Sequence, residues 1–155
     1  MKIRIGGLDH PEVQALLVEH VAFGRAGRPA ENAHVLPADA LTAPSITFWS
    51  AWDGETLAGF AALKALGCDD GEEHGELNSM RTAPAFLRRG VARLLLDHVI
   101  ATARTRGYVR LSLETGTTAP FEPANRLYEA AGFVDRSAFA DYPPSPLNRF
   151  MTMTL

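Results

Sequence analysis

The sequence predicts a mixed α/β protein with a layered sheet flanked by helices. Apolar runs of strand length alternate with two amphipathic segments that are long enough to be crossover helices, the first over 91–106 and the second starting at Pro123. Two further apolar runs, Ile46–Trp52 and Thr56–Lys64, flank Asp53-Gly54-Glu55, a strong signal for a β-hairpin. Together these patterns predict about seven strands and a small number of helices.

Length and composition favour one globular domain over residues 1–155. Hydrophobic residues make up 46% of the chain and charged residues 21%. A net charge of −3 argues against a nucleic-acid partner, whose phosphates require a basic face. Cys68 is the single cysteine, so an internal disulfide is impossible. The sequence shows neither a signal peptide nor an apolar membrane span, and we expect a cytoplasmic protein.

The N-terminal third begins with a strand and a helix. Lys2–Ile5 alternates in polarity as a half-buried strand does, and Pro11 and Glu12 mark the start of a helix that continues to about Phe23. His20 lies near the apolar stripe of this helix and is predicted to be packed. The segment Gly24–Ser45 is irregular, apart from a short possible helix at Ala38–Leu41.

An acidic stretch, Gly67–His74, could be mistaken for a metal site. It lacks a recognisable ligand spacing such as that of an EF-hand, so we interpret it as a solvated turn and predict no metal. The strand 75–82 follows this turn.

Arg88-Arg89-Gly90 lies between that strand and the helix expected from Val91. The first turn of a helix offers unpaired N–H groups at the positive end of its dipole, and glycine allows a ligand to approach the backbone. The segment therefore predicts an anion cradle, most plausibly for a pyrophosphate. It is neither a dinucleotide fingerprint nor a Walker loop.

The rest of the chain completes the alternation. In helix 91–106, the residues expected to face inward are Val91, Leu94, Leu95, Val99 and Ala103, and His98 is expected to be packed. The remaining predicted segments are the strands Arg110–Glu114, Phe133–Ala138 and Phe150–Leu155, and the loops Thr115–Glu122 and Phe139–Arg149. The last loop contains three prolines and Tyr142.

Two motifs resemble the core of the GNAT superfamily of acyl-CoA-dependent N-acetyltransferases. The family loop Gln/Arg-x-x-Gly-x-Gly/Ala is similar to the segment 87–92, although Leu87 departs from the usual first residue. The second family motif is a helix with the pattern Asn-x-x-x-Tyr-x-x-x-Gly-Phe. It is similar to Asn125, Tyr128 and Gly132-Phe133, with the tyrosine three rather than four residues after the asparagine. The resemblance implies a mixed, mostly antiparallel sheet of about six to seven strands flanked by helices, with the cofactor loop between strand 75–82 and helix 91–106.

The resemblance implies acetyl-CoA as the cofactor. Its pantetheine would pair with the strand backbone near Met80, its pyrophosphate would lie on the amides of the segment 88–93, and Asn125 would contact the cofactor. The implied cofactor-binding residues are Met80, Arg81, Thr82, Arg88, Arg89, Gly90, Val91, Ala92, Arg93, Asn125 and Tyr128.

Acetyl transfer to an amine requires a base and an acid, because a free alkyl amine has a pKa near 10 and the leaving thiolate must be protonated. Glu76 is the first candidate for the base, on a strand face predicted to carry Asn78 and Met80 as well. Glu114 is the second candidate and His74 the third. Either glutamate could instead bind the substrate ammonium or be an edge charge. Tyr128 is the candidate acid, with a packed core tyrosine as the alternative.

A narrower resemblance links the chain to a small bacterial subgroup of GNAT proteins labelled YsnE-like, in which a lysine is usual where Asn78 stands. In GNAT proteins the region after the first helix commonly forms a wall of the acceptor site, where the amine binds. The loop Phe139–Arg149, which contains Tyr142, is also expected to reach this site. The resemblance therefore makes Arg25, Arg28, Glu31 and His34 candidates for substrate contact, although a solvated loop is the other interpretation. GNAT proteins are often dimers, so a homodimer is one expected assembly.

Three hypotheses for function follow. The first is an enzyme that acetylates a primary amine of a small molecule, an amino acid or a peptide. The second is a GNAT fold that senses acyl-CoA without turning it over. The third, an unrelated α/β nucleotide binder, lacks a nucleotide motif. The presence of both Glu76 and Tyr128 favours the enzyme, and Leu87 slightly favours the sensor.

Overall fold

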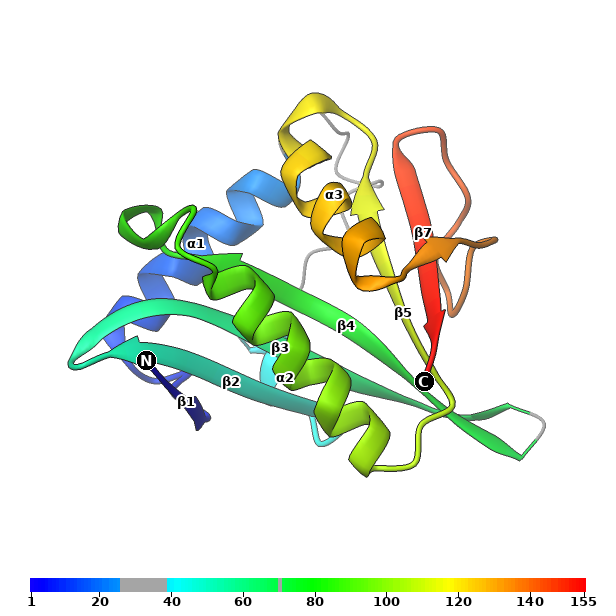
Figure 1. Cartoon of the computed structure of the whole chain (residues 1–155), viewed down its shortest axis with the longest axis horizontal. Helices are drawn as coiled ribbons and strands as arrows, with labels where there is room; N and C mark the ends of the chain where they lie inside the picture. Colours follow the sequence, from blue (N-terminus) through cyan, green and yellow to red (C-terminus); the bar gives the residue numbers. More distant parts are fainter. Residues whose placement is uncertain (26–38, 70) are drawn as a thin grey trace.

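A seven-stranded sheet forms the centre of the computed structural model, which describes residues 1–25, 39–69 and 71–155 (Figure 1). The strand order is β1-β2-β3-β4-β5-β7-β6, and β4–β5 is the one parallel pair among the described strands. The strands are β1 Lys2–Ile5, β2 Ile46–Asp53, β3 Thr56–Asp69, β4 Glu72–Thr82, β5 Arg110–Gly116, β6 Val134–Asp135 and β7 Asn148–Thr154. The prediction of a mostly antiparallel sheet of six to seven strands is confirmed.

Helices cover both faces of this sheet. The helices are α1 Pro11–Arg25, α2 Val91–Thr105 and α3 Glu122–Ala131, and short 3₁₀ turns occupy Ala40–Thr42, Pro84–Phe86 and Ala119–Phe121. One apolar cluster packs α2 and α3 against one face, and a second packs α1 against the other face. Alternation along the strands separates the two clusters: Phe60 and Ala62 face α1, whereas Ala61 and Leu63 face α2.

The turn predicted at Gly67–His74 is shorter than expected. The β3–β4 ladder continues to the pair Asp69–Glu72, so most of the acidic stretch is strand, and β4 begins at Glu72 instead of at residue 75. Charged residues are compatible with this end of the hairpin because Cys68, Glu72 and Glu73 are exposed there. Backbone pairing with the neighbouring strand outweighs the weak strand preference of acidic residues.

The pairing between β4 and β5 is short. It joins His74 to Arg110, Gly75 to Leu111 and Glu76 to Ser112, and it ends there. Beyond this point β4 remains paired with β3 while β5 pairs with β7, and the two strands diverge (Figure 1). The central pair of strands therefore forms a V that opens toward the N-terminal end of α2.

A β-bulge interrupts β4 at the start of this opening. Ser79 pairs with Ala62 and Leu77 pairs with Leu63, so Asn78 is the extra residue. Leu77 and Met80 consequently contact the same apolar cluster, although they are three positions apart and would lie on opposite faces of a regular strand. The prediction that Glu76 shares a face with Met80 is wrong, because the extra residue reverses the alternation between them.

Helix α2 is shifted in phase from the prediction. Leu94 was expected to face inward but is exposed, whereas Leu96 is fully buried. The buried residues are Val91, Leu95, Leu96, Val99, Ile100 and Ala103. His98 packs edge-on against Trp49 at 5.1 Å, as the packed interpretation predicts.

Both helices next to the opening are delimited by left-handed glycines, with Gly90 (φ 79°) before α2 and Gly132 (φ 107°) after α3.

The C-terminal half of the sheet has a polar face that no described helix covers. Arg110, Ser112 and Glu114 alternate on this face of β5, and Ser112 Oγ lies 2.9 Å from Thr152 Oγ1 of β7. The connection between β6 and β7 folds over it, where Phe139 packs edge-on against Phe150 at 5.8 Å.

Strand β6 is much shorter than the predicted Phe133–Ala138. No helix in the described part of the chain is long and apolar enough to cross a membrane.

Candidate active site

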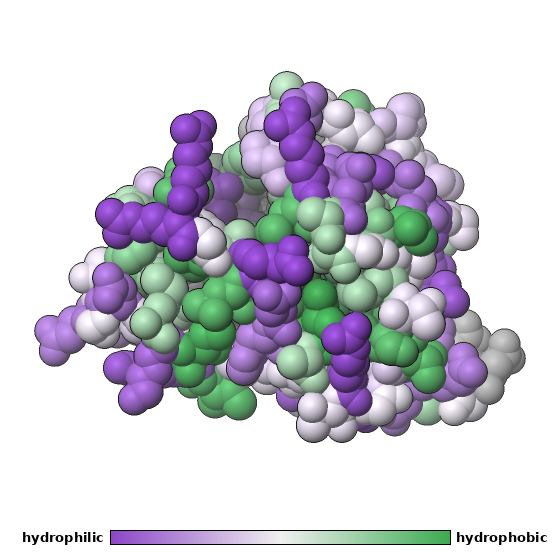
Figure 2. All heavy atoms as spheres, in the orientation of Figure 1, coloured by the Kyte–Doolittle hydropathy of each residue, from purple (hydrophilic) through white to green (hydrophobic). Residues whose placement is uncertain are grey.

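A cleft of about 630 Å³ lies in the opening between β4 and β5. Its walls come from the end of α1, residues 77–82 of β4, the segment 84–90, the first turn of α2, the end of β5, the turn before α3 and α3 itself. In the space-filling view the surface is hollowed between the start of α2 and α3 (Figure 2). The lining of the cleft is mostly apolar with a few polar groups, as that of a small-molecule site commonly is.

The predicted anion cradle lies at one end of this cleft. Arg88, Gly90, Val91, Ala92 and Arg93 all line it. Gly90 has a left-handed backbone, and a Cβ added there would meet no atom within 4 Å, so the space in front of the first turn of α2 is open. The free N–H groups of a 15-residue helix point into this space. This end of the cleft therefore suits a phosphate group.

The three arginines of the cradle differ in their surroundings. Arg93 forms an exposed i,i+4 salt bridge with Asp97 at 3.0 Å, and Arg88 itself has a positive φ of 62°. The Arg89 guanidinium lies over the Phe86 ring at 5.4 Å and is not part of the cleft lining. Arg88 and Arg93 are thus better placed than Arg89 to contact a ligand with their side chains.

The edge of β4 supplies backbone groups to the middle of the cleft. Residues 77–82 pair with β3 on one side, and the described ladders give them no strand partner on the side of β5. An extended ligand with amide groups can pair with such an edge as an added strand does. Met80, Arg81 and Thr82, which were predicted to hold pantetheine, all lie on this edge and line the cleft.

Buried polar atoms without a protein partner gather along the same wall. Among the described residues there are five such side-chain atoms, and four belong to residues that line the cleft: His20 Nδ1, Asn78 Oδ1, Ser79 Oγ and Arg81 Nε. Buried polar groups are nearly always hydrogen-bonded, so this concentration indicates a wall adapted to polar ligand atoms. This wall of the cleft therefore offers polar contacts to a ligand.

Glu114 and Tyr128 both line the cleft, and they lie close enough for the charge of Glu114 to act on the Tyr128 hydroxyl. Asn148 Nδ2 donates a hydrogen bond of 2.6 Å to Glu114 Oε1, which fixes the carboxylate. Tyr128 is 9% exposed and packs against Phe133. Burial, with the Glu114 charge as a second cause, raises the pKa of Tyr128 to about 12, so its hydroxyl stays protonated at neutral pH.

Glu76, the first candidate for the base, lies buried beneath Tyr142 and outside the cleft. It is 2% exposed and is not part of the cleft lining. Its carboxylate accepts hydrogen bonds from the Tyr142 hydroxyl at 2.7 Å and from Asn78 Nδ2 at 3.4 Å. Burial raises the pKa of Glu76 despite these bonds. Tyr142 belongs to the loop predicted to reach the acceptor site, and it closes over the polar face of the sheet at this carboxylate.

Asn125 has its side chain occupied within the protein. Its Oδ1 accepts a hydrogen bond from Thr115 Oγ1 at 2.9 Å, and its Nδ2 donates to the Gly116 carbonyl at 3.0 Å. The carboxamide is buried and does not line the cleft. This side chain joins the start of α3 to the end of β5, and the predicted contact of Asn125 with the cofactor stays a prediction.

His20 and Phe23 of α1 line the cleft, which the sequence did not predict. The Arg81 guanidinium lies over the Phe23 ring at 4.5 Å, and burial with the nearby Arg81 charge lowers the pKa of His20 to about 4. His20 packs edge-on against Phe60 at 5.4 Å, as the packed interpretation predicts, but it also lines the cleft. Arg28, Glu31 and His34 lie outside the described residues, as does the side chain of Arg25.

No cluster of three or more metal-ligating side chains occurs in residues 1–25, 39–69 and 71–155. His74, the third candidate for the base, instead lies at the far end of β4 from the cleft and lines a second pocket.

Comparison with known proteins identifies the family. The model of the acetyltransferase (GNAT) family matches residues 14–133, which include the cradle, the bulged strand and α3. The chain belongs to the GNAT acetyltransferase family. Its place in that family makes it an enzyme, an acetyl-CoA-dependent acyltransferase, and confirms the family resemblance of the two motifs.

Relatives within the family agree with the narrower resemblance. The chain is 50% identical over 153 residues to the uncharacterized N-acetyltransferase YedL of Escherichia coli, covering 99% of this chain and 94% of that one. It is 48% identical over 155 residues to the uncharacterized N-acetyltransferase YsnE of Bacillus subtilis, covering 100% of each. The GNAT fold is also that of a Bacillus subtilis acetyltransferase solved in complex with CoA, with a TM-score of 0.73, 17% identity and coverage of 99% and 98%.

Proposed function

We propose that this GNAT protein transfers the acetyl group of acetyl-CoA directly to a primary amine of a small molecule, an amino acid or a peptide. The observation that carries the proposal is the cleft in the β4–β5 opening. It joins a helix N-terminus suited to phosphate, a strand edge suited to amides, and a carboxylate–tyrosine pair in one continuous cavity.

The chain would bind acetyl-CoA along this cleft. The first turn of α2 and the side chains of Arg88 and Arg93 would hold the pyrophosphate. The free edge of Met80–Thr82 would pair with the pantetheine amides. Bound acetyl-CoA would supply an activated thioester. A backbone N–H near Met80, next to the bulge, is the best-placed donor to stabilise negative charge on the thioester oxygen.

Glu114 is the stronger candidate for the general base, because it lines the cleft together with Tyr128 and Glu76 does not. Its negative charge would attract a protonated amine and accept a proton from it, so that the nitrogen lone pair can form the new C–N bond. Glu76 remains the second candidate. Burial raises the pKa of Glu76, but Tyr142 and Asn78 occupy its carboxylate.

Tyr128 would donate its proton to the sulfur as the C–S bond breaks, which leaves CoA as a thiol. The pKa of Tyr128 is raised by burial and further by the charge of Glu114. When Glu114 takes the amine proton, that charge is lost and the pKa of Tyr128 falls. The acid would therefore strengthen at the step that needs it, a coupling that requires both groups in one cleft.

Thiol release with a panel of amines tests the proposal, with acetyl-CoA binding measured in parallel by thermal unfolding. A ligand at about 100 times its Kd stabilises the folded state by about 2.7 kcal/mol. We expect stabilisation by acetyl-CoA and CoA but not by ATP, and amine-dependent thiol release that Glu114→Gln and Tyr128→Phe reduce. Binding without thiol release for any amine would favour an acyl-CoA sensor instead.

A further inference from the structure

The cleft reaches both faces of the sheet through the opening between β4 and β5. On the face covered by α2 and α3 it is lined by Val91, Leu127 and Tyr128, and on the face covered by α1 it is lined by His20 and Phe23. The cofactor cradle belongs to the first of these faces, because it is formed by the first turn of α2. The part of the cleft next to α1, which we call the α1 side, therefore lies across the sheet from the cradle.

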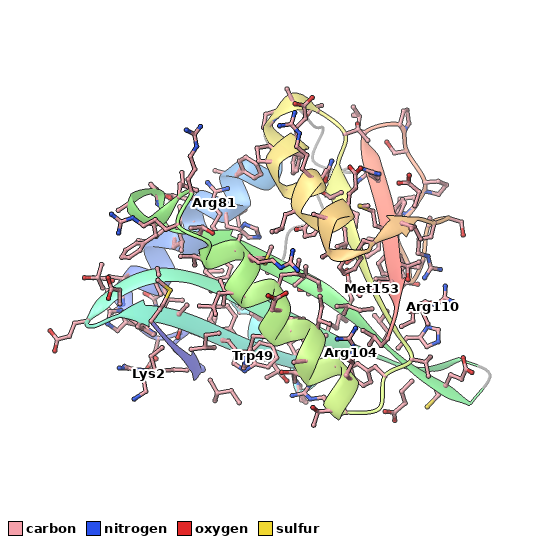
Figure 3. The ribbon with its side chains drawn as sticks, in the orientation of Figure 1. Lys2, Trp49, Arg81, Arg104, Arg110 and Met153 are labelled. Carbon is pink, nitrogen blue, oxygen red and sulfur yellow. The ribbon has the colours of Figure 1, made fainter. Side chains whose placement is uncertain are left out.

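Arg81 brings a positive charge to the α1 side. Its guanidinium lies over the Phe23 ring at 4.5 Å, and Figure 3 labels it at the opposite end of the sheet from Arg110. No salt bridge or side-chain hydrogen bond within the described residues uses this guanidinium, and its Nε is buried without a partner. Glu19 interacts with it electrostatically, but that residue is exposed. A half-buried guanidinium with unused donors suits an anion that a ligand supplies.

His20 adjoins this guanidinium without adding charge. Burial, together with the charge of Arg81, lowers the pKa of His20 to about 4, so the imidazole is neutral at pH 7. It packs edge-on against Phe60 at 5.4 Å, and its Nδ1 has no partner among the described residues. At neutral pH the pair therefore carries one positive charge. One charge matches a carboxylate better than a phosphate monoester, which carries a charge of about −1.5 to −2.

Glu114 faces the same side of the sheet from the other wall of the cleft. Arg81 pairs with Phe60 on β3, and Phe60 faces α1. On β5, Leu113 packs into the cluster beneath α2, so its neighbour Glu114 faces the other way, toward the α1 side. Strands β4 and β5 diverge here, and Arg81 and Glu114 both line the one cavity between them. A single ligand can therefore contact a positive group on β4 and a negative group on β5.

We propose that the Arg81 side chain binds a carboxylate of the acceptor, so that the acceptor is an amine that also carries a carboxylate. This inference rests on the proposed acetyl transfer. The ammonium group would lie at Glu114, where its proton is removed, and the carboxylate would lie across the opening at Arg81, which matches the two charges of the cleft. The backbone of Arg81 stays available to pantetheine, because the side chain faces α1 whereas the strand edge faces the opening.

Matched acceptors test the carboxylate directly. We would compare glycine, β-alanine, γ-aminobutyrate and glycyl-glycine with their amides, measuring kcat/KM by thiol release and correcting it for the fraction of neutral amine. A charge-assisted hydrogen bond predicts that the free acid of the fitting length exceeds its amide by about 10-fold to 100-fold. Equal values at every length, with thiol release retained, would overturn the proposal and leave acetyl transfer intact.

An acceptor with a different anion tests the match to a single charge. Aminoethylphosphonate has the same spacing between amine and acid as β-alanine and should react no faster. A higher kcat/KM for the phosphonate would overturn the assignment of a carboxylate.

Variants locate the effect. Arg81→Gln should reduce the ratio of acid to amide toward unity, and Arg81→Lys should retain part of it, because lysine keeps the charge but not the planar pair of donors. Arg4→Gln is the matched control: Arg4 also lies over an aromatic ring, that of Trp52 at 5.8 Å, but it does not line the cleft. A ratio that survives Arg81→Gln, or that falls equally in Arg4→Gln, would overturn the proposal. Loss of CoA binding in Arg81→Gln would assign the guanidinium to the cofactor and overturn it as well.

Calorimetry separates this inference from the proposed function. The same acids and amides are titrated into the CoA-bound protein, which needs no turnover. Tighter binding of an acid than of its amide, lost in Arg81→Gln, would support the site even if no amine released thiol. Equal binding of every acid and its amide would contradict it.

Discussion

Replacing Gly90 by aspartate is the sharpest test of where the cofactor pyrophosphate binds. Gly90 precedes the first turn of α2 with a φ of 79°, and a Cβ there would meet no atom within 4 Å. A side chain at this position therefore fits sterically and extends into the open space in front of the helix. Gly90→Asn is the matched control, because asparagine tolerates a left-handed backbone and can cap the helix as aspartate does, but it carries no charge.

The expected difference between the two variants is electrostatic. Two unit charges about 5 Å apart repel by about 1 kcal/mol in water and by about 3 kcal/mol at an effective dielectric constant of 20. Gly90 is exposed, so the lower value is the minimum and the higher value applies where the ligand excludes water. Gly90→Asp should therefore bind CoA roughly 5-fold to 150-fold more weakly than Gly90→Asn.

Calorimetric titration with CoA at two salt concentrations measures this difference. The gap between the variants should narrow at high salt, because ions screen the repulsion. Dephospho-CoA, which retains the pyrophosphate, should show the same gap. Equal dissociation constants for the two variants would refute the reasoning and place the pyrophosphate away from the first turn of α2.

Other predictions concern His20, the catalytic candidates and Asn125. The folded-state pKa of His20 is lowered to about 4, so the unfolded state binds more protons, and stability that is complete above pH 6.5 should fall by up to about 3 kcal/mol as the pH drops toward 4. Urea unfolding at pH 7 and 4.5 should show this loss in the wild type and a smaller one in His20→Gln. Tyr128→Phe should lower kcat and leave the Kd of acetyl-CoA nearly unchanged; a collapse of affinity would contradict the acid assignment. Glu114→Gln should lower kcat/KM most near neutral pH and less at high pH, where the amine is already neutral, and a pH-independent loss would indicate a structural role. Asn125→Leu should destabilise the protein by about 1–3 kcal/mol in urea, because it leaves Thr115 Oγ1 and the Gly116 carbonyl unpaired.

Local chemistry made the elements around the cradle predictable. A glycine at the start of α2, a proline in the first turn of α3 and a glycine after it each restrict the backbone within a few residues. The family motifs overlap these same positions. The number of strands and the place of the cofactor loop could therefore be predicted from the sequence.

Features that depend on partners far along the chain could not be predicted. Nothing near Asn78 signals a bulge, because the bulge is defined by the register with β3. That one extra residue separates Glu76 from the face of Met80. Asn125 likewise resembled a ligand-binding residue, and only the approach of β5 shows that its amide is occupied. Arg110 and Arg136, which line the second pocket together with His74, come from β5 and from the chain after β6, which are distant in sequence.

The short ladder between β4 and β5 has a consequence for motion. Three residue pairs join a half made of β1 to β4 to a half made of β5 to β7, whereas the pairings within each half are mostly longer. Few backbone hydrogen bonds therefore oppose rotation of one half against the other about this junction. A molecule that contacts both arms of the V would couple the halves, and amide hydrogen exchange should then slow in β7 as well as in β4.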